Sequence, residues 1–79
     1  MAYDVTAGQG QITIIITGIP NQQFFITITQ GATIVYSEAV TLPNSGTKTS
    51  LVPLGAGAYH VHIENVGATD TFDSDEMVT

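Results

Sequence analysis

Hydrophobic and polar residues alternate with a period of two along most of this 79-residue sequence. In the segment 11–17 isoleucine occupies every second position, and Phe24, Ile26 and Ile28 carry the same alternation through 23–30. Successive side chains of a β-strand point to opposite faces, so this period is typical of strands buried on one face. No segment shows the 3.6-residue period of an amphipathic helix. The pattern predicts strands at 3–6, 11–17, 23–30, 33–36, 38–42, 47–52, within 54–66 and at 69–73.

Residues typical of tight turns separate these segments. Pro20 and Asn21 follow the first long strand, Gln30 and Gly31 predict a hairpin, and residues 43–46 read Pro-Asn-Ser-Gly. About seven short strands with turns between them predict an all-β fold, a small β-sandwich or barrel of antiparallel strands. We expect a single domain over 1–79, ending in a flexible acidic tail at 74–79.

The stretch Leu54–Val66 is the part of the sequence around which the predicted fold is organised. A glycine-rich corner leads into a strand with three apolar residues on one face and three polar residues on the other: Tyr59, Val61 and Ile63 against His60, His62 and Glu64. The first face is typical of a core, and the second faces solvent or a site.

This stretch resembles the penultimate strand of immunoglobulin-like and fibronectin-III-like modules, in which a turn precedes a tyrosine and then alternating apolar residues. The resemblance covers roughly residues 11–73 and implies a small immunoglobulin-like β-sandwich. It also implies that the Tyr59 hydroxyl bonds the backbone a few residues upstream, near Leu54. The chain has no cysteine and no tryptophan, so it is more similar to the compact modules of bacterial surface proteins and of phage heads and tails than to antibody domains.

The charge of the chain limits the classes of molecule that we expect it to bind. Lys48 is the only cation against seven Asp and Glu residues, and the formal net charge is −6. Such a chain cannot neutralise phosphates, so we expect no binding to nucleic acid or to anionic membranes. The first residues contain neither a basic nor an apolar run, and no run approaches the roughly 20 apolar residues of a membrane helix. We therefore expect a complete chain made in a cytoplasm without a secretory signal.

His60 and His62 are the residues with the strongest metal-ligand character. On one face of a strand their Cα atoms would lie roughly 6.5–7 Å apart, a spacing that suits two ligands of one zinc ion. Glu64 lies about 13 Å from His60 along the strand, and the sequence has no other His and no Cys to complete the site. We therefore expect both histidines to be cross-strand polar residues and expect no cofactor; a pH-sensitive or interface role is the alternative.

The remaining polar residues do not predict catalysis. The acidic residues near the C-terminus could bind Ca²⁺ through oxygen, but they lack the spacing of an EF-hand loop, and we expect them to be solvated. They are Asp70, Asp73, Asp75 and Glu76. No serine stands in a nucleophile elbow, and Gly55 and Gly57 precede a strand where a phosphate site needs a helix. We expect a protein that is not an enzyme.

Several apolar residues fall on the face opposite to the predicted core. If the even-numbered isoleucines of 11–17 point inward, Ile15 points outward, and the same alternation turns Phe25, Val35 and Val52 outward, with Leu51 as the core residue of its strand. Clustered on one sheet, these residues would form a patch large enough to mark a protein interface. We expect docking or self-association through Ile15, Phe25, Val35 and Val52, giving a homo-oligomer or a protein lattice.

The favoured hypothesis is a structural or decoration protein of a phage virion, an auxiliary capsid or tail protein that docks to a repeating lattice. The alternative is a carbohydrate- or cell-surface-binding adhesion module located on a bacterial cell surface. Its aromatic candidates are Tyr3, Phe25 and Tyr36. A metal-dependent activity at His60 and His62 is a third possibility.

Overall fold

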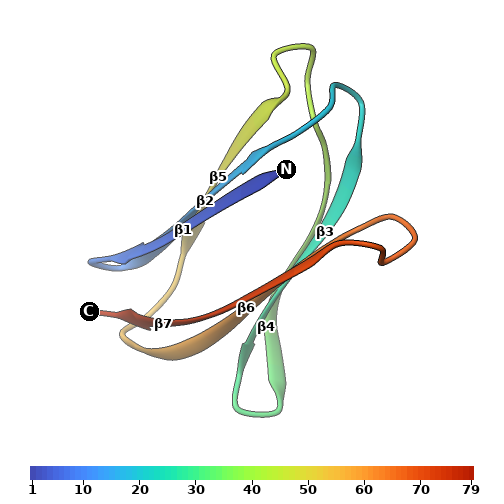
Figure 1. Ribbon diagram of the computed structural model, residues 1–79. Coiled ribbons are helices and arrows are strands. Elements are labelled where there is room, and N and C mark those ends of the chain that lie inside the picture. The colour runs from blue at the N-terminus through green and yellow to red at the C-terminus, as the bar shows by residue number, and fades with distance from the viewer.

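The chain folds into two antiparallel β-sheets that pack face to face, as the sequence pattern predicts. The computed structural model describes all 79 residues. One sheet has the strand order β1-β2-β5 and the other has the order β4-β3-β6-β7 (Figure 1). The strands are β1 (Ala2–Gly8), β2 (Gln11–Thr17), β3 (Gln23–Gln30), β4 (Thr33–Thr41), β5 (Thr47–Pro53), β6 (Gly57–Asn65) and β7 (Thr71–Val78). The molecule is therefore an all-β sandwich of seven strands.

The core lies between the two sheets and consists of alternate residues of the strands. It contains Ile12, Ile14, Ile16, Phe24, Ile26, Ile28, Val40, Leu42, Val52, Tyr59, Val61, Ile63 and Val78. Burial of apolar surface is worth about 25 cal/mol for each Å², so the alternation itself drives the two sheets together. Threonines at the positions between them form much of the outer surface of β2 and β3.

Pairing between β2 and β5 decides which residues of β5 enter the core. Ile12 lies opposite Val52, and directly opposite residues of an antiparallel pair share a face. Val52 is therefore 1% exposed, whereas its neighbour Leu51 is 63% exposed on the outer face. The prediction that Leu51 is buried and Val52 points outward is wrong. Because Leu51 and Val52 are both apolar, the alternation allows either of them to point inward. Only the register with β2 decides that it is Val52.

Residues 74–78, which were expected to form a flexible tail, belong to β7, so the predicted strand end at residue 73 is wrong. Val78 is buried, and the backbone N–H of Thr79 donates to the carbonyl of Gly8 at 3.3 Å. The inward positions of β7 include Ser74 and Glu76, which are joined by a hydrogen bond. These polar residues conceal the two-residue period in the sequence, which is why the strand was predicted to end too early.

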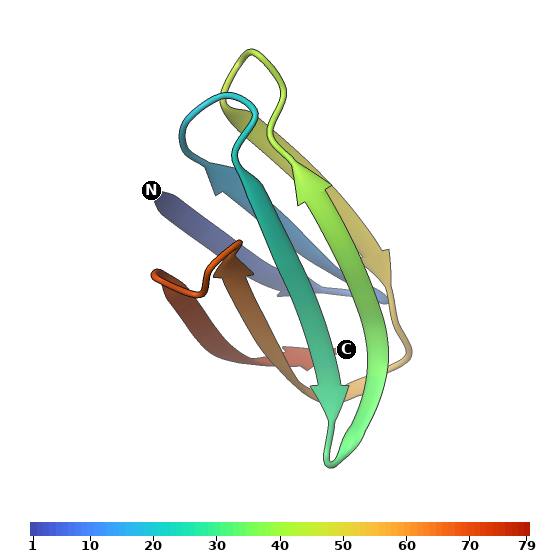
Figure 2. The same cartoon turned by 90° about the vertical axis from the view of Figure 1, so that its right-hand side faces the viewer.

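The predicted strands 33–36 and 38–42 form one continuous strand, β4. Ile28 pairs with Tyr36 and Thr29 pairs with Ile34, so Val35 lies at a β-bulge without a partner of its own. At its turn the β3–β4 hairpin extends beyond the rest of the sandwich (Figure 2). The hairpin turn itself is where the sequence predicts it, with Gly31 at a φ of 61°.

The Tyr59 hydroxyl donates a hydrogen bond of 2.8 Å to the carbonyl oxygen of Gly55. The rest of the side chain is buried in the core. This confirms the upstream backbone contact that the resemblance of the stretch 54–66 implies, and it anchors the corner that leads into β6.

Two loops at one end of the sandwich are held together at Gly46. The N–H of Gly18, which follows β2, donates to the carbonyl of Gly46, which precedes β5, at 2.8 Å. Gly46 has a φ of 76°, and a Cβ atom there would lie 2.6 Å from the Gly18 carbonyl oxygen. Only glycine fits this approach of the two backbones.

Candidate functional site

The four residues predicted to form an interface do not share one surface. Val52 is in the core, and Ile15 lies half-buried on the outer face of the three-stranded sheet. Phe25 and Val35 belong to the four-stranded sheet and are 45% and 38% exposed. The thickness of the sandwich separates Ile15 from these two residues. Phe25 and Val35 are therefore the pair that the structure leaves on one sheet.

Ile34 is an exposed apolar residue that the sequence reasoning missed. It is 64% exposed, although the alternation places it on the inner face with Tyr36. The bulge at Val35 interrupts the alternation and sets Ile34 opposite Thr29, near the projecting turn of the hairpin. Two consecutive apolar residues beside a turn were the only signal in the sequence, and that signal does not identify a bulge.

β4 is an edge strand whose second side is unpaired. Natural edge strands are protected by lysine, proline, a bulge, an inward-pointing charge or a covering segment. β4 contains no lysine and no proline, and its protective features are the bulge at Val35 and the inward-pointing Glu38. Its single charged residue, Glu38, accepts a hydrogen bond of 2.6 Å from the hydroxyl of Tyr36. This bond to Glu38, together with burial, raises the pKa of Tyr36 to about 12. The one charged residue of β4 therefore already has a hydrogen-bond donor within its own strand.

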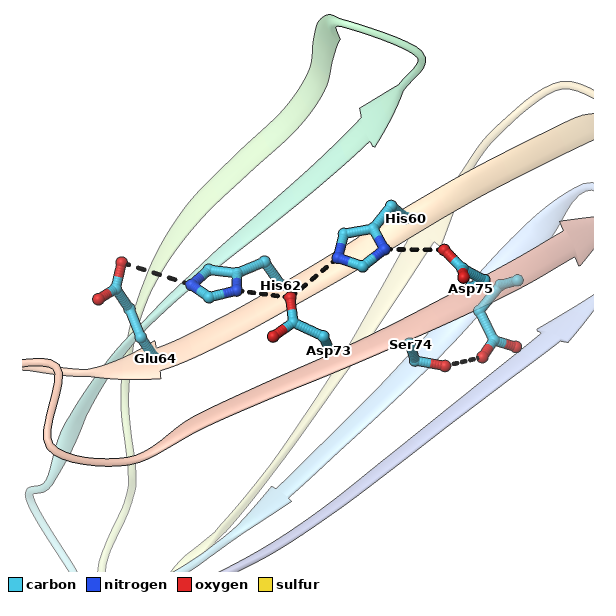
Figure 3. Close-up of polar contacts among 7 residues, drawn as sticks. His60, His62, Glu64, Asp73, Ser74 and Asp75 are labelled. Carbon is cyan, nitrogen blue, oxygen red and sulfur yellow. Dashed lines mark hydrogen bonds and ion pairs between the residues drawn. The ribbon is translucent and has the colours of Figure 1, made fainter.

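A second cluster lies on the outer face of β6 and β7, where His60 and His62 meet acidic residues of the neighbouring strand (Figure 3). Register pairs His60 with Asp75 and His62 with Asp73, which brings imidazoles and carboxylates together. His60 Nδ1 lies 2.8 Å from Asp75 Oδ1, and His60 Nε2 lies 2.8 Å from Asp73 Oδ1. His62 Nδ1 contacts the same Asp73 oxygen at 2.8 Å. We refer to these four residues as the His–Asp ladder.

The geometry of His60 favours an imidazolium. A neutral imidazole has one N–H donor, so one of its nitrogens would face a carboxylate oxygen with lone pairs on both atoms. Hydrogen bonds to Asp75 and then to Asp73 raise the pKa of His60 above its ordinary value. Hydrogen bonds from His62 and then His60 lower the pKa of Asp73. Both shifts favour the charged pair, which joins β6 to β7.

The acidic residues of the C-terminal region do not converge on one point. Asp70 accepts a hydrogen bond of 2.7 Å from the Tyr3 hydroxyl, and Glu76 accepts one from Ser74 on the inner side of β7. Asp73 and Asp75 are engaged in the His–Asp ladder on the outer side. No three His, Cys, Asp or Glu side chains are grouped so that they could hold a metal ion.

The three aromatic residues considered for carbohydrate binding lie on different surfaces. The ring of Tyr3 stacks on Phe72 at 5.3 Å and meets the edge of Phe24 at 6.0 Å, so it is half-buried against the core. Tyr36 faces inward beside the core, and Phe25 is on the outer face of the same sheet. They form no common platform on which a sugar ring could stack.

One hollow of about 450 Å³ lies on the outer face of the four-stranded sheet, beside the end of the His–Asp ladder. Its walls include Thr29, His60, Asp75 and Met77. Both nitrogens of His60 are already bonded to carboxylates, so the hollow offers no free base or ligand nitrogen.

Comparison of the chain with models of known protein families and with curated proteins finds no match. The structure contains no helix with the length and apolar character needed to cross a membrane.

Proposed function

We propose that this chain is a non-enzymatic structural protein that docks to, or assembles into, a larger protein array, and that the array is a phage virion. The observation that carries the proposal is the free edge of β4, which pairs with β3 on one side only. The strand is nine residues long and contains one charged residue. Exposed Ile34 and Val35 lie on this strand. Backbone groups at such an edge pair readily with another strand, which is a common way for β-domains to associate.

Two further observations support the proposal. The Tyr59 contact to Gly55 is the feature that the resemblance to immunoglobulin-like modules implies, and such modules occur in phage heads and tails. The imidazole and carboxylate groups of the His–Asp ladder bond to one another, which leaves them no evident part in catalysis. In this role the protein would be an auxiliary capsid or tail protein.

An antibody raised against the purified chain tests the proposal by electron microscopy. We expect immunogold label on virus particles from the source of the sequence, at regular positions on the capsid or tail. Label confined to bacterial cell surfaces would overturn the virion proposal and favour the adhesion alternative. A glycan array provides the second measurement, and we expect no binding because Tyr3, Phe25 and Tyr36 share no platform.

A further inference from the structure

The sandwich has four edge strands, and three of them carry features that oppose pairing with another chain. β7 exposes Asp73 and Asp75, and β1 exposes Asp4. β5 contains Lys48 and ends at Pro53, which has no backbone N–H. Charged residues and prolines of this kind are how edge strands avoid unwanted partners. β4 also holds one charge, Glu38, but this carboxylate is bonded to Tyr36 of the same strand. The bulge of β4 lies near the hairpin turn, so residues 36–41 keep regular strand pairing with β3.

The sequence of β4 is self-complementary about Ser37. If a second copy of β4 runs antiparallel with Ser37 opposite its own equivalent, Tyr36 of each copy lies opposite Glu38 of the other. Val35 of each copy then lies opposite Ala39. In these pairs next to Ser37, apolar residues meet apolar residues and a hydroxyl donor meets a carboxylate, so the pairs are compatible.

The faces of the sheet agree with these pairs. Tyr36 and Glu38 both point to the inner face, because each pairs with a buried residue of β3. Ala39 lies opposite Phe25 and shares its outer face, and Val35, one position before Tyr36, points the same way. A register shifted by one residue would place inner residues against outer ones.

The same register makes one apolar patch from residues that are separate in a single chain. Ala39 is small and lies next to the half-exposed ring of Phe25. Val35 of the second copy would lie on the other side of Ala39, since strands of a sheet are about 4.8 Å apart. Phe25 and Val35 would then cover Ala39 from both sides, and the twofold axis repeats the arrangement.

The occupant that this edge fits is a second copy, because the pairs next to Ser37 are complementary to themselves and set no two carboxylates opposite each other. Each chain has a net charge of −6, so two copies associate only through a contact that keeps their carboxylates apart. Around Ser37 the one carboxylate, Glu38, meets a hydroxyl and not another carboxylate. Asp73 and Asp75 lie on β7, at the far edge of the same sheet.

We propose that two copies of this chain pair antiparallel through β4, centred on Ser37, so that the four-stranded sheet of one copy continues into that of the other. The pairing deepens the proposed function and rests on it, since assembly into an array is what a self-complementary edge serves.

Single cysteines test the register directly, because the chain has none of its own. Directly opposite residues of an antiparallel pair have Cα atoms about 4.5–5.5 Å apart, within the range of a disulfide. Ser37→Cys should therefore form a covalent dimer under mild oxidation at least about tenfold faster than Thr49→Cys, an exposed position on the β5 edge. Equal rates at the two positions would overturn the proposal.

Light scattering with matched lysine variants tests the β4 pairing separately from the proposed function as a virion protein. Val35→Lys and Leu51→Lys each place a lysine at an exposed apolar position of an edge strand. We expect Val35→Lys to raise the dimer dissociation constant at least about tenfold and Leu51→Lys to leave it unchanged, with circular dichroism showing both folded. A wild-type chain that stays monomeric at millimolar concentration, or a dimer insensitive to Val35→Lys, overturns the β4 pairing. Label on virus particles would still support the proposed function in either case.

Discussion

At the scale of single residues, His60 carries the most constrained polar contacts on the surface. Its two nitrogens each lie 2.8 Å from a carboxylate of β7, and Asp73 serves both histidines through one oxygen. The residue sits on the outer face of its strand, as the sequence predicts, and its partners come from the register of β6 with β7. The consequence is a dependence of stability on pH.

We expect the free energy of unfolding to be highest between about pH 4 and 6.5 and to fall on both sides. The pKa of His60 is raised above 6.5, so its contribution is complete below that pH and is lost as the pH rises through the folded-state pKa. The pKa of Asp73 is lowered below 3.8, so its contribution is complete above that pH and is lost as the pH falls through the folded-state pKa. Urea unfolding followed by circular dichroism over a pH series measures both limbs.

The matched variants for this profile are His60→Gln and Lys48→Gln. Substitution of His60 should flatten the decline above about pH 6.5, because the titrating imidazolium is gone. Lys48→Gln changes a residue on the edge of the other sheet, so the decline should be the same as in the parent protein. A decline of the same slope in His60→Gln would show that other groups cause it.

Tyr59 gives a second prediction at the residue scale. Tyr59→Phe keeps the buried ring and removes only the hydrogen bond to the Gly55 carbonyl. We expect a loss of about 1 kcal/mol in the free energy of unfolding, the usual net value of one intramolecular hydrogen bond. Urea denaturation measures it, and a stability equal to that of the parent would mean that the corner is held by packing alone.

At the scale of elements, the two edges of the four-stranded sheet differ. β7 is an edge in its sheet, but its last residues bond to the turn between β1 and β2 through Gly8, Gly10 and Thr79. Its outer face carries the acidic half of the His–Asp ladder. β4 has neither a covering segment nor a cluster of charges. One edge is therefore closed within the chain, and the other is free for a partner.

The closure of β7 predicts unequal effects of two neighbouring substitutions. Val78→Ala removes a buried side chain and should lower the free energy of unfolding by about 2 kcal/mol. Met77→Ala changes an exposed side chain and should cost less than about 0.5 kcal/mol. Urea denaturation of both variants makes the comparison. Equal, small effects would mean that the C-terminal residues contribute nothing to the core.

At the scale of the whole molecule, stabilisation by a small core is opposed by repulsion among many carboxylates. The core consists of thirteen residues, and the surface carries seven carboxylates against one lysine. Small domains bury a modest share of their surface, so repulsion between the carboxylates is a substantial part of the balance. The His–Asp ladder, the contact of 3.7 Å between His62 Nε2 and Glu64 Oε1 and a few hydroxyl contacts offset it within the chain.

Salt should therefore stabilise the protein at alkaline pH. At about pH 9, above the titration range of histidine, added NaCl screens repulsion and has few ion pairs to weaken. We expect the free energy of unfolding to rise by up to about 1 kcal/mol between low salt and 0.5 M NaCl, a rough upper value for surface charges. CaCl₂ at the same ionic strength should act equally, because the acidic side chains do not converge. A larger effect of Ca²⁺ would reveal a specific site.

Much of the fold could be predicted from the sequence, and the errors share one cause. Strands 11–17 and 23–30 were correct in both bounds. In each strand three alternate apolar residues outweigh the single apolar residue of the other phase, Ile15 or Phe25. Errors arose where the alternation was ambiguous, at the adjacent apolar residues Leu51 and Val52, or concealed, at Glu76 in β7. Of the candidate site, the outward directions of Phe25 and Val35 could be predicted, and the exposure of Ile34 could not.

By itself the sequence determined the all-β class, the inward face of most strands, the corner at Tyr59 and the net charge of −6. These follow from local geometry and composition, since side chains along a strand point alternately to one face and the other. The tertiary structure decided the register of β5, the course of β7, the partners of His60 and the bulge that exposes Ile34. Each depends on which strand lies alongside, and that choice is made by contacts between residues distant in the chain.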